Sequence, residues 1–189
     1  MIKNTRETPV TDETRESLPR IMRLRIPWLI LGLIAGTLVS VTVSRFEKIL
    51  SENISLAFFL PLIVYMSDAV GTQTETMYVR LLARSKVGFL KNVLKELLVG
   101  IELGAILGAG VGLIAWLWLS RFDIALTVGL TMFINVAIAP LIALIIPEIL
   151  FKEHADPALG AGPITTVIQD FISLLIYFAI ATFIVGLTF

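Results

Sequence analysis

The stretch ITTVIQDFISLLIYFAIATF, residues 164–183, is an almost unbroken apolar run with a single carboxylate, Asp170, near its centre. A helix that crosses a bilayer needs about 20 predominantly apolar residues, and this run has that length. No lysine or arginine follows it in the chain. The stretch therefore predicts a transmembrane helix whose one acidic group needs a partner other than a nearby basic side chain.

The rest of the chain is also rich in apolar residues and poor in charged ones. Of its 189 residues 57% are hydrophobic and 16% are charged, and its mean hydropathy is +0.91. A soluble domain carries about a quarter charged residues. The absence of cysteine excludes disulfides and thiolate metal sites, and the single histidine, His154, excludes a multi-histidine site within one chain. The net charge is zero and there is no long basic block, so no nucleic-acid partner is expected.

Five apolar segments are long enough to cross a bilayer as helices, at residues 26–44, 56–79, 96–119, 124–150 and 159–187. They lack the alternation of barrel strands, and a barrel needs about eight strands or more. The sequence therefore predicts an all-α integral membrane protein with five transmembrane helices. The third segment carries a glycine at every fourth position, which predicts close packing against another helix: Gly100, Gly104, Gly108 and Gly112.

Basic residues predict the orientation, because cytoplasmic loops are enriched in lysine and arginine. The N-terminal tail, the connection after the second segment and the connection after the fourth together hold 12 of the 15 basic residues. We therefore expect residues 1–25 to form a cytoplasmic tail and residues 26–189 to form the membrane domain. The predicted location is the cell membrane, with the C-terminus outside. The polar start of the chain is not typical of a cleavable signal peptide.

Four carboxylates fall inside the apolar segments: Asp68, Glu75, Glu102 and Asp170. An ionised group near the bilayer centre costs at least about 2.5–3.5 kcal/mol. At a rise of about 1.5 Å per residue, Asp68 and Asp170 lie roughly 16–18 Å into their helices, near the midplane. Glu75 and Glu102 lie nearer the cytoplasmic face. The alternatives are protonated acids that are hydrogen-bonded within the bundle and, for the two glutamates, side chains that reach toward the headgroups.

Each of the two aspartates belongs to a row of polar side chains along one face of its predicted helix. The second segment has a stripe at i, i+4 and i+7, made of Asp68, Thr72 and Glu75. The fifth segment has a similar stripe, made of Thr166, Asp170, Ser173 and Tyr177. A polar stripe on an apolar helix is the expected wall of a hydrated path. Carboxylates and hydroxyls suit hard ions such as Mg²⁺, Ca²⁺ or Mn²⁺.

Signatures of catalysis are missing from the sequence. It has no glycine loop for phosphate, no Ser/His/Asp set and no HExxH pattern, so neither an enzyme nor a resident cofactor is expected. The divalent cation is expected as the transported ion.

Two stretches resemble the MgtE-type magnesium channels. LPLIVYMSDAVGTQTETMYVRLLA (60–83) is similar to the motif of the family's second helix, through Pro61, Gly71, Thr72, Gln73, Arg80 and Ala83. IIPEILFKEHADPALGAGPITTVIQD (145–170) is similar in its prolines and in the final aspartate. Asp170 thereby corresponds to the family's central pore aspartate. The family's asparagine in the second helix aligns with Ala69, and the preceding glycine aligns with Asp68.

The resemblance implies a homodimer with five transmembrane helices per protomer and an ion path at the dimer interface. The two copies of Asp170 would hold a hydrated Mg²⁺ there. The family's full-length members carry cytosolic regulatory domains, and the short tail leads us to expect intrinsic gating, no gating or a separate regulatory subunit. The expected function is a divalent-cation channel, with Mg²⁺ first. A proton- or sodium-coupled carrier and a non-transporting subunit remain as alternatives.

Overall fold

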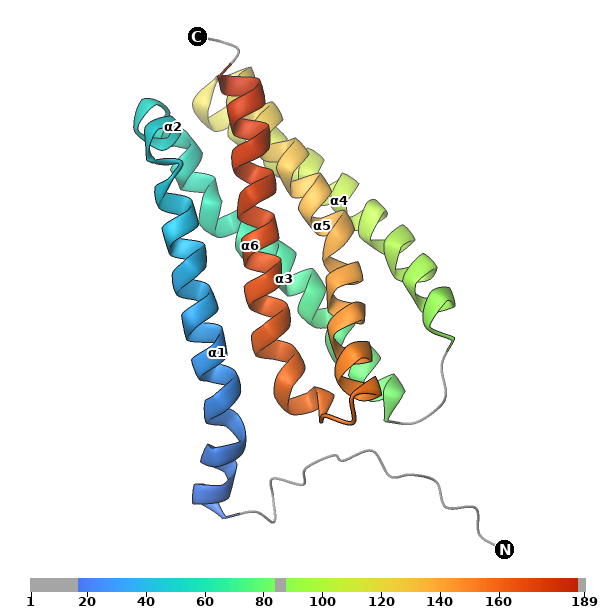
Figure 1. Ribbon diagram of the computed structural model, residues 1–189. Helices are drawn as coiled ribbons and strands as arrows, with labels where there is room; N and C mark the ends of the chain where they lie inside the picture. Colours follow the sequence, from blue (N-terminus) through green and yellow to red (C-terminus); the bar gives the residue numbers. More distant parts are fainter. Residues whose placement is uncertain (1–16, 84–87, 187–189) are drawn as a thin grey trace, which may run out of the picture.

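The computed structural model describes residues 17–83 and 88–186, and these two ranges fold into six helices (Figure 1). The helices are α1 (Leu18–Ser44), α2 (Glu47–Glu52), α3 (Ile54–Leu82), α4 (Phe89–Leu119), α5 (Phe122–Lys152) and α6 (Pro157–Val185). Five of them, all but α2, are long and apolar enough to cross a membrane, which confirms the predicted number of spans. The helix α1 begins at Leu18, within the predicted tail of residues 1–25.

The start of α6 shows how local sequence sets a helix boundary. Asp156 is the N-cap residue, and its side chain accepts a hydrogen bond of 2.9 Å from the backbone nitrogen of Ala158. Pro157 follows at the first helical position, where its fixed φ angle suits a helix and its missing N–H costs nothing. The Asp-Pro-Ala sequence therefore fixes where the last spanning helix begins.

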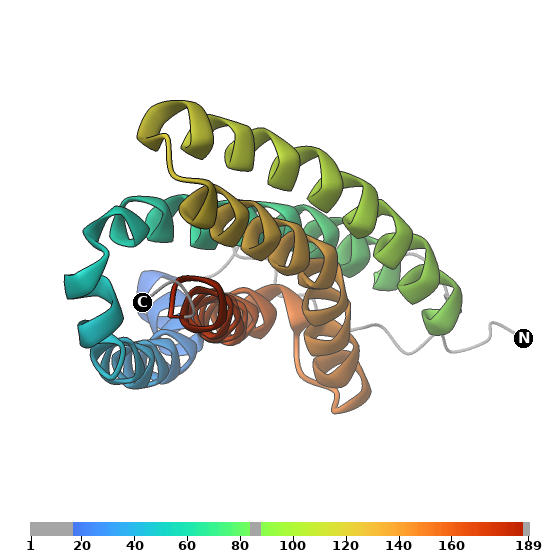
Figure 2. The ribbon, with the colours of Figure 1, turned by 90° about the horizontal axis from the view of Figure 1, so that it is seen from above.

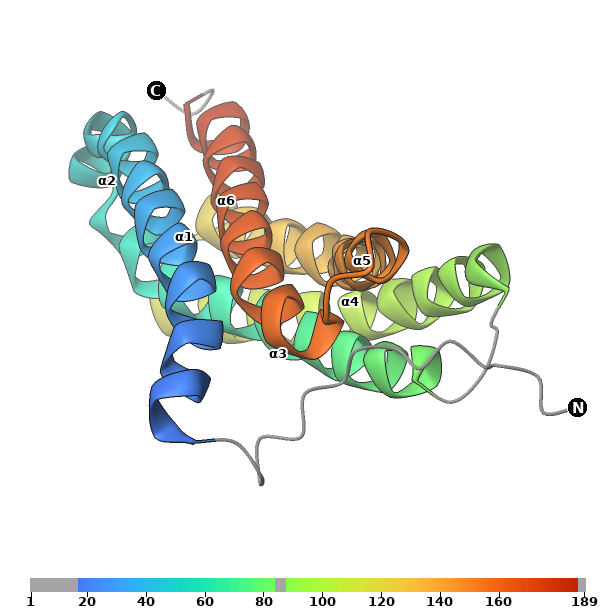
Figure 3. The same cartoon turned by 60° about the horizontal axis from the view of Figure 1, so that its bottom comes forward.

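The central helix of the bundle is α5, which packs against α3, α4 and α6. Half of the residues in its most apolar stretch are buried, whereas α1 has no buried residue. Viewed from above, α4 lies at one edge beside α5, and α1 lies at another edge beside α6 (Figure 2). The first turns of α1 project beyond the start of α6 (Figure 3). The large apolar side chains left exposed on α1 and α4 suit contact with lipid.

The glycine stripe of α4 faces α5, as the sequence predicts. A Cβ added to Gly100 would lie 2.8 Å from the backbone oxygen of Ala137, and one added to Gly104 would lie 2.6 Å from that of Phe133. Gly108 is equally tight against Gly129, at 2.7 Å. The absence of side chains at these positions lets the two helix backbones approach closely. The stripe is therefore a packing feature of the bundle.

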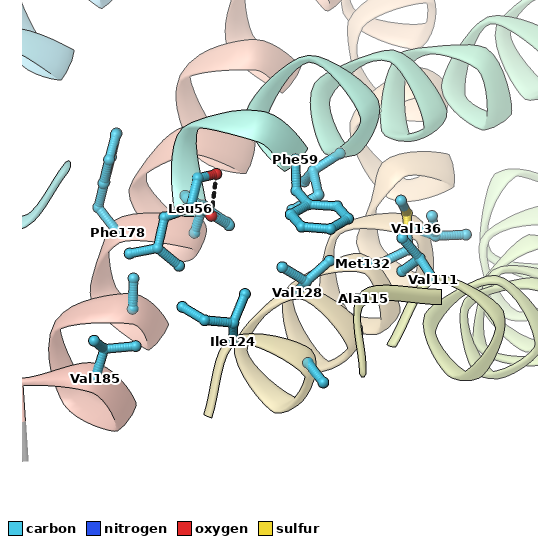
Figure 4. Packing of buried hydrophobic residues seen from close by; sticks show 14 of the residues in the cluster. Leu56, Phe59, Val111, Ala115, Ile124, Val128, Met132, Val136, Phe178 and Val185 are labelled. Atoms are coloured by element: carbon cyan, nitrogen blue, oxygen red, sulfur yellow. Dashed lines mark hydrogen bonds between the residues drawn. The ribbon is translucent and has the colours of Figure 1, made fainter. Parts of the chain in front are cut away.

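An apolar cluster fills the end of the bundle where α3 and α5 begin and α6 ends (Figure 4). Leu56, Ile124 and Phe178 are among its buried members. Tyr177 is buried there as well, and its hydroxyl donates a 2.7 Å hydrogen bond to the backbone oxygen of Leu56. Further along α3, beyond this cluster, the buried side chains become polar. The apolar cluster therefore occupies one end of the bundle, and polar side chains lie between α3 and α6 near their middle.

Candidate cation site

The middle of α3 meets the first half of α6, and polar side chains of the two helices come together there. The hydroxyl of Thr166 donates a 3.2 Å hydrogen bond to Oδ1 of Asp68. Asp68 and Asp170 are both half-buried and lie close enough for their carboxylates to repel each other. The structure therefore brings together the two aspartates that the sequence places near the midplane.

Glu75 extends this acidic face along α3. Its Oε1 atom lies 3.8 Å from the position that a Cβ on Gly162 would take, and Thr165 also faces the carboxylate. Glu75 is half-buried and interacts electrostatically with Asp68. The absence of a side chain at Gly162 leaves room for the glutamate beside α6. Glu75 therefore belongs with Asp68 and Asp170 on the face shared by α3 and α6, which we call the acidic face.

The acidic face has no basic partner among the residues that the structure describes. Ion pairs within those residues join Lys48 to Glu52, Arg121 to Asp123, and Lys152 to Glu148. All three pairs lie near helix ends rather than in the middle of the bundle. The carboxylates of the acidic face therefore need compensation from water, protons or a cation.

The part of the chain that the structure describes does not provide a direct metal cage. Within residues 17–83 and 88–186, no three side chains of histidine, cysteine, aspartate or glutamate converge closely enough to ligate one metal ion. Asp68, Glu75 and Asp170 are instead spread along the acidic face. Such a spread suits an ion that keeps its own water molecules, as Mg²⁺ often does.

Of the other predicted site residues, Thr72 borders the acidic face, whereas Glu102 and Ser173 lie apart from it. Thr72 is exposed on α3 between Asp68 and Glu75. Glu102 is exposed on α4, the helix whose glycine stripe packs against α5. The structure therefore does not bring Glu102 to the acidic face.

Ser173 occupies a different face from the one that the stripe on the fifth segment predicts. It is 2% exposed, and its hydroxyl donates a 3.1 Å hydrogen bond to the hydroxyl of Ser67. The packed line of α6 takes every fourth residue, and these residues are Pro157, Ala161, Thr165, Gln169, Ser173, Tyr177, Ala181 and Val185. Ser173 and Tyr177 belong to this line, whereas Asp170 stands beside it. The predicted stripe therefore divides into a buried line and the acidic face.

Sequence reasoning missed three buried polar residues that group with Ser173 next to the acidic face: Ser67, Asn135 and Gln169. Asn135 and Gln169 are 0% and 1% exposed. The amide of Asn135 donates a 3.2 Å hydrogen bond to the backbone oxygen of Ser173. The sequence held one signal for this group, because Asn135 is a strongly polar amide inside an apolar spanning segment.

Two further acids connect α3 to its neighbours nearer the other end of the bundle. Glu96 on α4 accepts a 3.1 Å hydrogen bond from Thr74. Glu148 on α5 accepts a 2.8 Å hydrogen bond from the hydroxyl of Tyr78 and pairs with Lys152 at 3.0 Å. Both acids bind a side chain of α3, and Glu148 also has a basic partner, which none of the carboxylates of the acidic face has among the described residues.

Five helices long and apolar enough to span a membrane define the class, a polytopic membrane protein, and its row of carboxylates has no basic partner within residues 17–83 and 88–186. The family model MgtE, described as a divalent cation transporter, matches residues 60–180. The chain belongs to this family.

Curated relatives agree with the family model. A magnesium transporter MgtE of Bacillus subtilis is 33% identical over 161 residues, which cover 84% of this chain and 36% of the relative. A protein of the same name from Enterococcus faecalis is 32% identical over 174 residues, covering 90% of this chain and 38% of the relative. One from Thermus thermophilus is 29% identical over 165 residues, covering 83% and 35%. The chain thus spans little more than a third of the length of these relatives.

Proposed function

We propose that this chain carries divalent cations, with Mg²⁺ preferred, across the cell membrane along the acidic face of α3 and α6. The observation that carries the proposal is the group of Asp68, Glu75 and Asp170, half-buried in a membrane bundle with no basic partner among the described residues. Thr72 and Thr166 add hydroxyl oxygens beside them. A cation compensates this negative charge directly.

The ion passes with water attached. Mg²⁺ sheds its water reluctantly, and one protomer has no converging set of three acidic or imidazole ligands among the residues described. Carboxylates spread along a helix face can hold such an ion through its water molecules. This mode of binding also accounts for a site without cysteine or clustered histidine.

A second copy of the chain completes the path. Thr72, Gln73 and Thr76 are exposed on α3 beside the acidic face, in a helix long and apolar enough to span a membrane. Polar side chains that face hydrocarbon are costly, so a partner or water must cover them. A two-fold homodimer in which α3 and α6 of both copies line the axis provides this cover and doubles the number of carboxylates.

The membrane potential drives inward flow. With the N-terminus in the cytoplasm, a divalent ion entering the cell gains roughly 4.6 kcal/mol per 100 mV, which is twice the value for a single charge. A passive path therefore needs no other energy source.

The test is flux of Mg²⁺ into liposomes that contain the purified chain and an entrapped magnesium indicator. Asp170→Asn keeps the shape of the side chain but removes its charge. We expect it to lower flux by about tenfold or more, since a lost ion contact of about 1.4 kcal/mol changes affinity tenfold. Asp68→Asn should have a smaller effect.

Glu52→Gln is the matched control, because Glu52 is an exposed acid on α2, outside the spanning helices. This substitution should leave the flux unchanged. Parent-like flux from folded Asp170→Asn protein would refute the proposed path. Flux that a pH gradient drives at zero voltage would identify a coupled carrier instead.

A further inference from the structure

Three helices meet in a buried polar group beside the acidic face, made of Ser67 on α3, Asn135 on α5, and Gln169 and Ser173 on α6. None of the four is more than 2% exposed. We call this group the polar junction. It lies in the interior of the protomer, so it cannot be part of the surface along which ions pass.

The hydrogen bonds of the junction converge on Ser67. The amide nitrogen of Gln169 donates to the hydroxyl of Ser67 at 3.2 Å and also to its backbone oxygen. The hydroxyl of Ser173 donates to the same hydroxyl at 3.1 Å. The hydroxyl of Ser67 in turn donates to the backbone oxygen of Asn135 at 3.5 Å. The junction therefore connects α3 to both α5 and α6 at a single level.

Each aspartate of the acidic face directly follows a member of the junction in the sequence. Ser67 precedes Asp68, and Gln169 precedes Asp170. Neighbouring helix residues point about 100° apart, so one member of each pair faces the interior while the other faces the proposed path. The two residues of each pair are consecutive in one helix. A shift of α3 against α6 at the junction therefore changes the distance between the two carboxylates by a similar amount.

Gly71 lets the two helices come this close. The amide of Gln169 lies across it, so that a Cβ on Gly71 would overlap Oε1 and would lie 2.7 Å from Nε2 and 2.8 Å from Cδ. Any side chain at position 71 must displace the amide that binds Ser67. Close approach of the backbones explains why glycine stands here.

We infer that the polar junction is a positioning device that sets the spacing of Asp68 and Asp170 and thereby the choice between divalent ions. The two carboxylates repel each other, which favours separation of α3 and α6, and the junction opposes this separation. Mg²⁺ keeps its water molecules in near-ideal octahedral geometry, whereas Ca²⁺ tolerates irregular coordination, so carboxylates that hold the ion through its water molecules suit Mg²⁺ only at a defined spacing. A loosened junction therefore favours Ca²⁺ relative to Mg²⁺. This inference rests on the proposed function.

The experiment compares Mg²⁺ and Ca²⁺ flux in liposomes for two junction variants, Ser67→Ala and Gly71→Ala. We expect the ratio of Mg²⁺ to Ca²⁺ flux to fall by about tenfold, the scale of effect seen when support around a metal ligand is removed. Gly110→Ala is the matched control for Gly71→Ala, because nothing lies within 4 Å of its added Cβ. If Gly71→Ala does not fold, Ser67→Ala alone decides the outcome.

A double variant that combines Ser67→Ala with Asp170→Asn separates an effect on the spacing of the carboxylates from an effect on the stability of the fold. If the junction acts through the spacing of the carboxylates, Ser67→Ala should change the ion ratio little further once Asp170 is neutral. Junction variants that fold and keep the parental ratio, beside a defective Asp170→Asn, would overturn this inference alone. Parental flux in Asp170→Asn would instead refute the proposed function.

Discussion

Substitution of a single stripe glycine on α4 should separate the packing role of that helix from transport. In Gly104→Ala the added Cβ would lie 2.6 Å from the backbone oxygen of Phe133 and 3.3 Å from its Cδ2 atom. Real Cβ atoms essentially never approach closer than 3.0 Å, and ordinary contacts begin at 3.4 Å, so the backbones must separate by about 0.4–0.8 Å at this point. The nearest obstacle is backbone rather than the end of a flexible side chain, so local rearrangement gives little relief.

The expected cost of this separation is about 1–3 kcal/mol, the range for an extra methyl group in a tightly packed interior. Gly110→Ala, on the same helix with open space around its Cβ, should be neutral or stabilise the helix by up to about 1 kcal/mol. Thermal unfolding in detergent measures the difference between the two variants. Flux per folded molecule should be unchanged in both, because α4 carries none of the acidic face.

Equal stability of the two alanine variants would refute the close approach of α4 and α5. A variant that keeps its stability but loses flux would contradict the separation of packing from transport. Gly104→Ala and Gly110→Ala add the same methyl group to the same helix, so helix propensity cancels between them. The measured difference therefore reports the contact with Phe133.

The remaining predictions concern the dimer and the apolar cluster. The chain has no cysteine, so single cysteines can be introduced and crosslinked without background. Thr72→Cys should crosslink between two copies of the chain. Leu113→Cys, which is exposed on α4, should not. The reverse pattern would refute an axis lined by α3. Tyr177→Phe should lower the free energy of unfolding by about 1 kcal/mol, because it removes one buried hydrogen bond to the backbone oxygen of Leu56. Unchanged thermal unfolding would show that this bond contributes nothing.

The spanning helices could be predicted because each is a long apolar run, and the bilayer permits few alternatives to a helix for such a run. The short helix α2 escaped prediction because six residues with the sequence EKILSE carry no membrane signal. The sequence also predicted a similar level for Asp68 and Asp170 from the rise per residue, and the structure places these two side chains near each other. The sequence did not predict in the same way which face of each helix contacts which neighbouring helix.

Ser173 and Glu102 show why the faces were harder to predict. On α6 the packed line advances by four residues, so each step turns it by about 40°, and position 173 falls on this line whereas position 170 falls beside it. Only the neighbouring helices decide which side is covered. For Glu102 the sequence held the information, since a residue two positions from both Gly100 and Gly104 points about 160–200° away from a stripe of such glycines.

The arrangement around α3 explains how like charges can be held together in one part of a membrane bundle. On one side of Asp68 the helix is fixed by the apolar cluster, through Leu56 and Ile63, which are fully buried. On the other side Thr74 and Tyr78 fix it through hydrogen bonds to Glu96 and Glu148. Repulsion between the aspartates therefore acts on a stretch of helix that is supported on both sides. A site supported in this way can keep its carboxylates apart by a constant distance when no ion is present, so that the energy of the arriving ion is not spent on assembling the site.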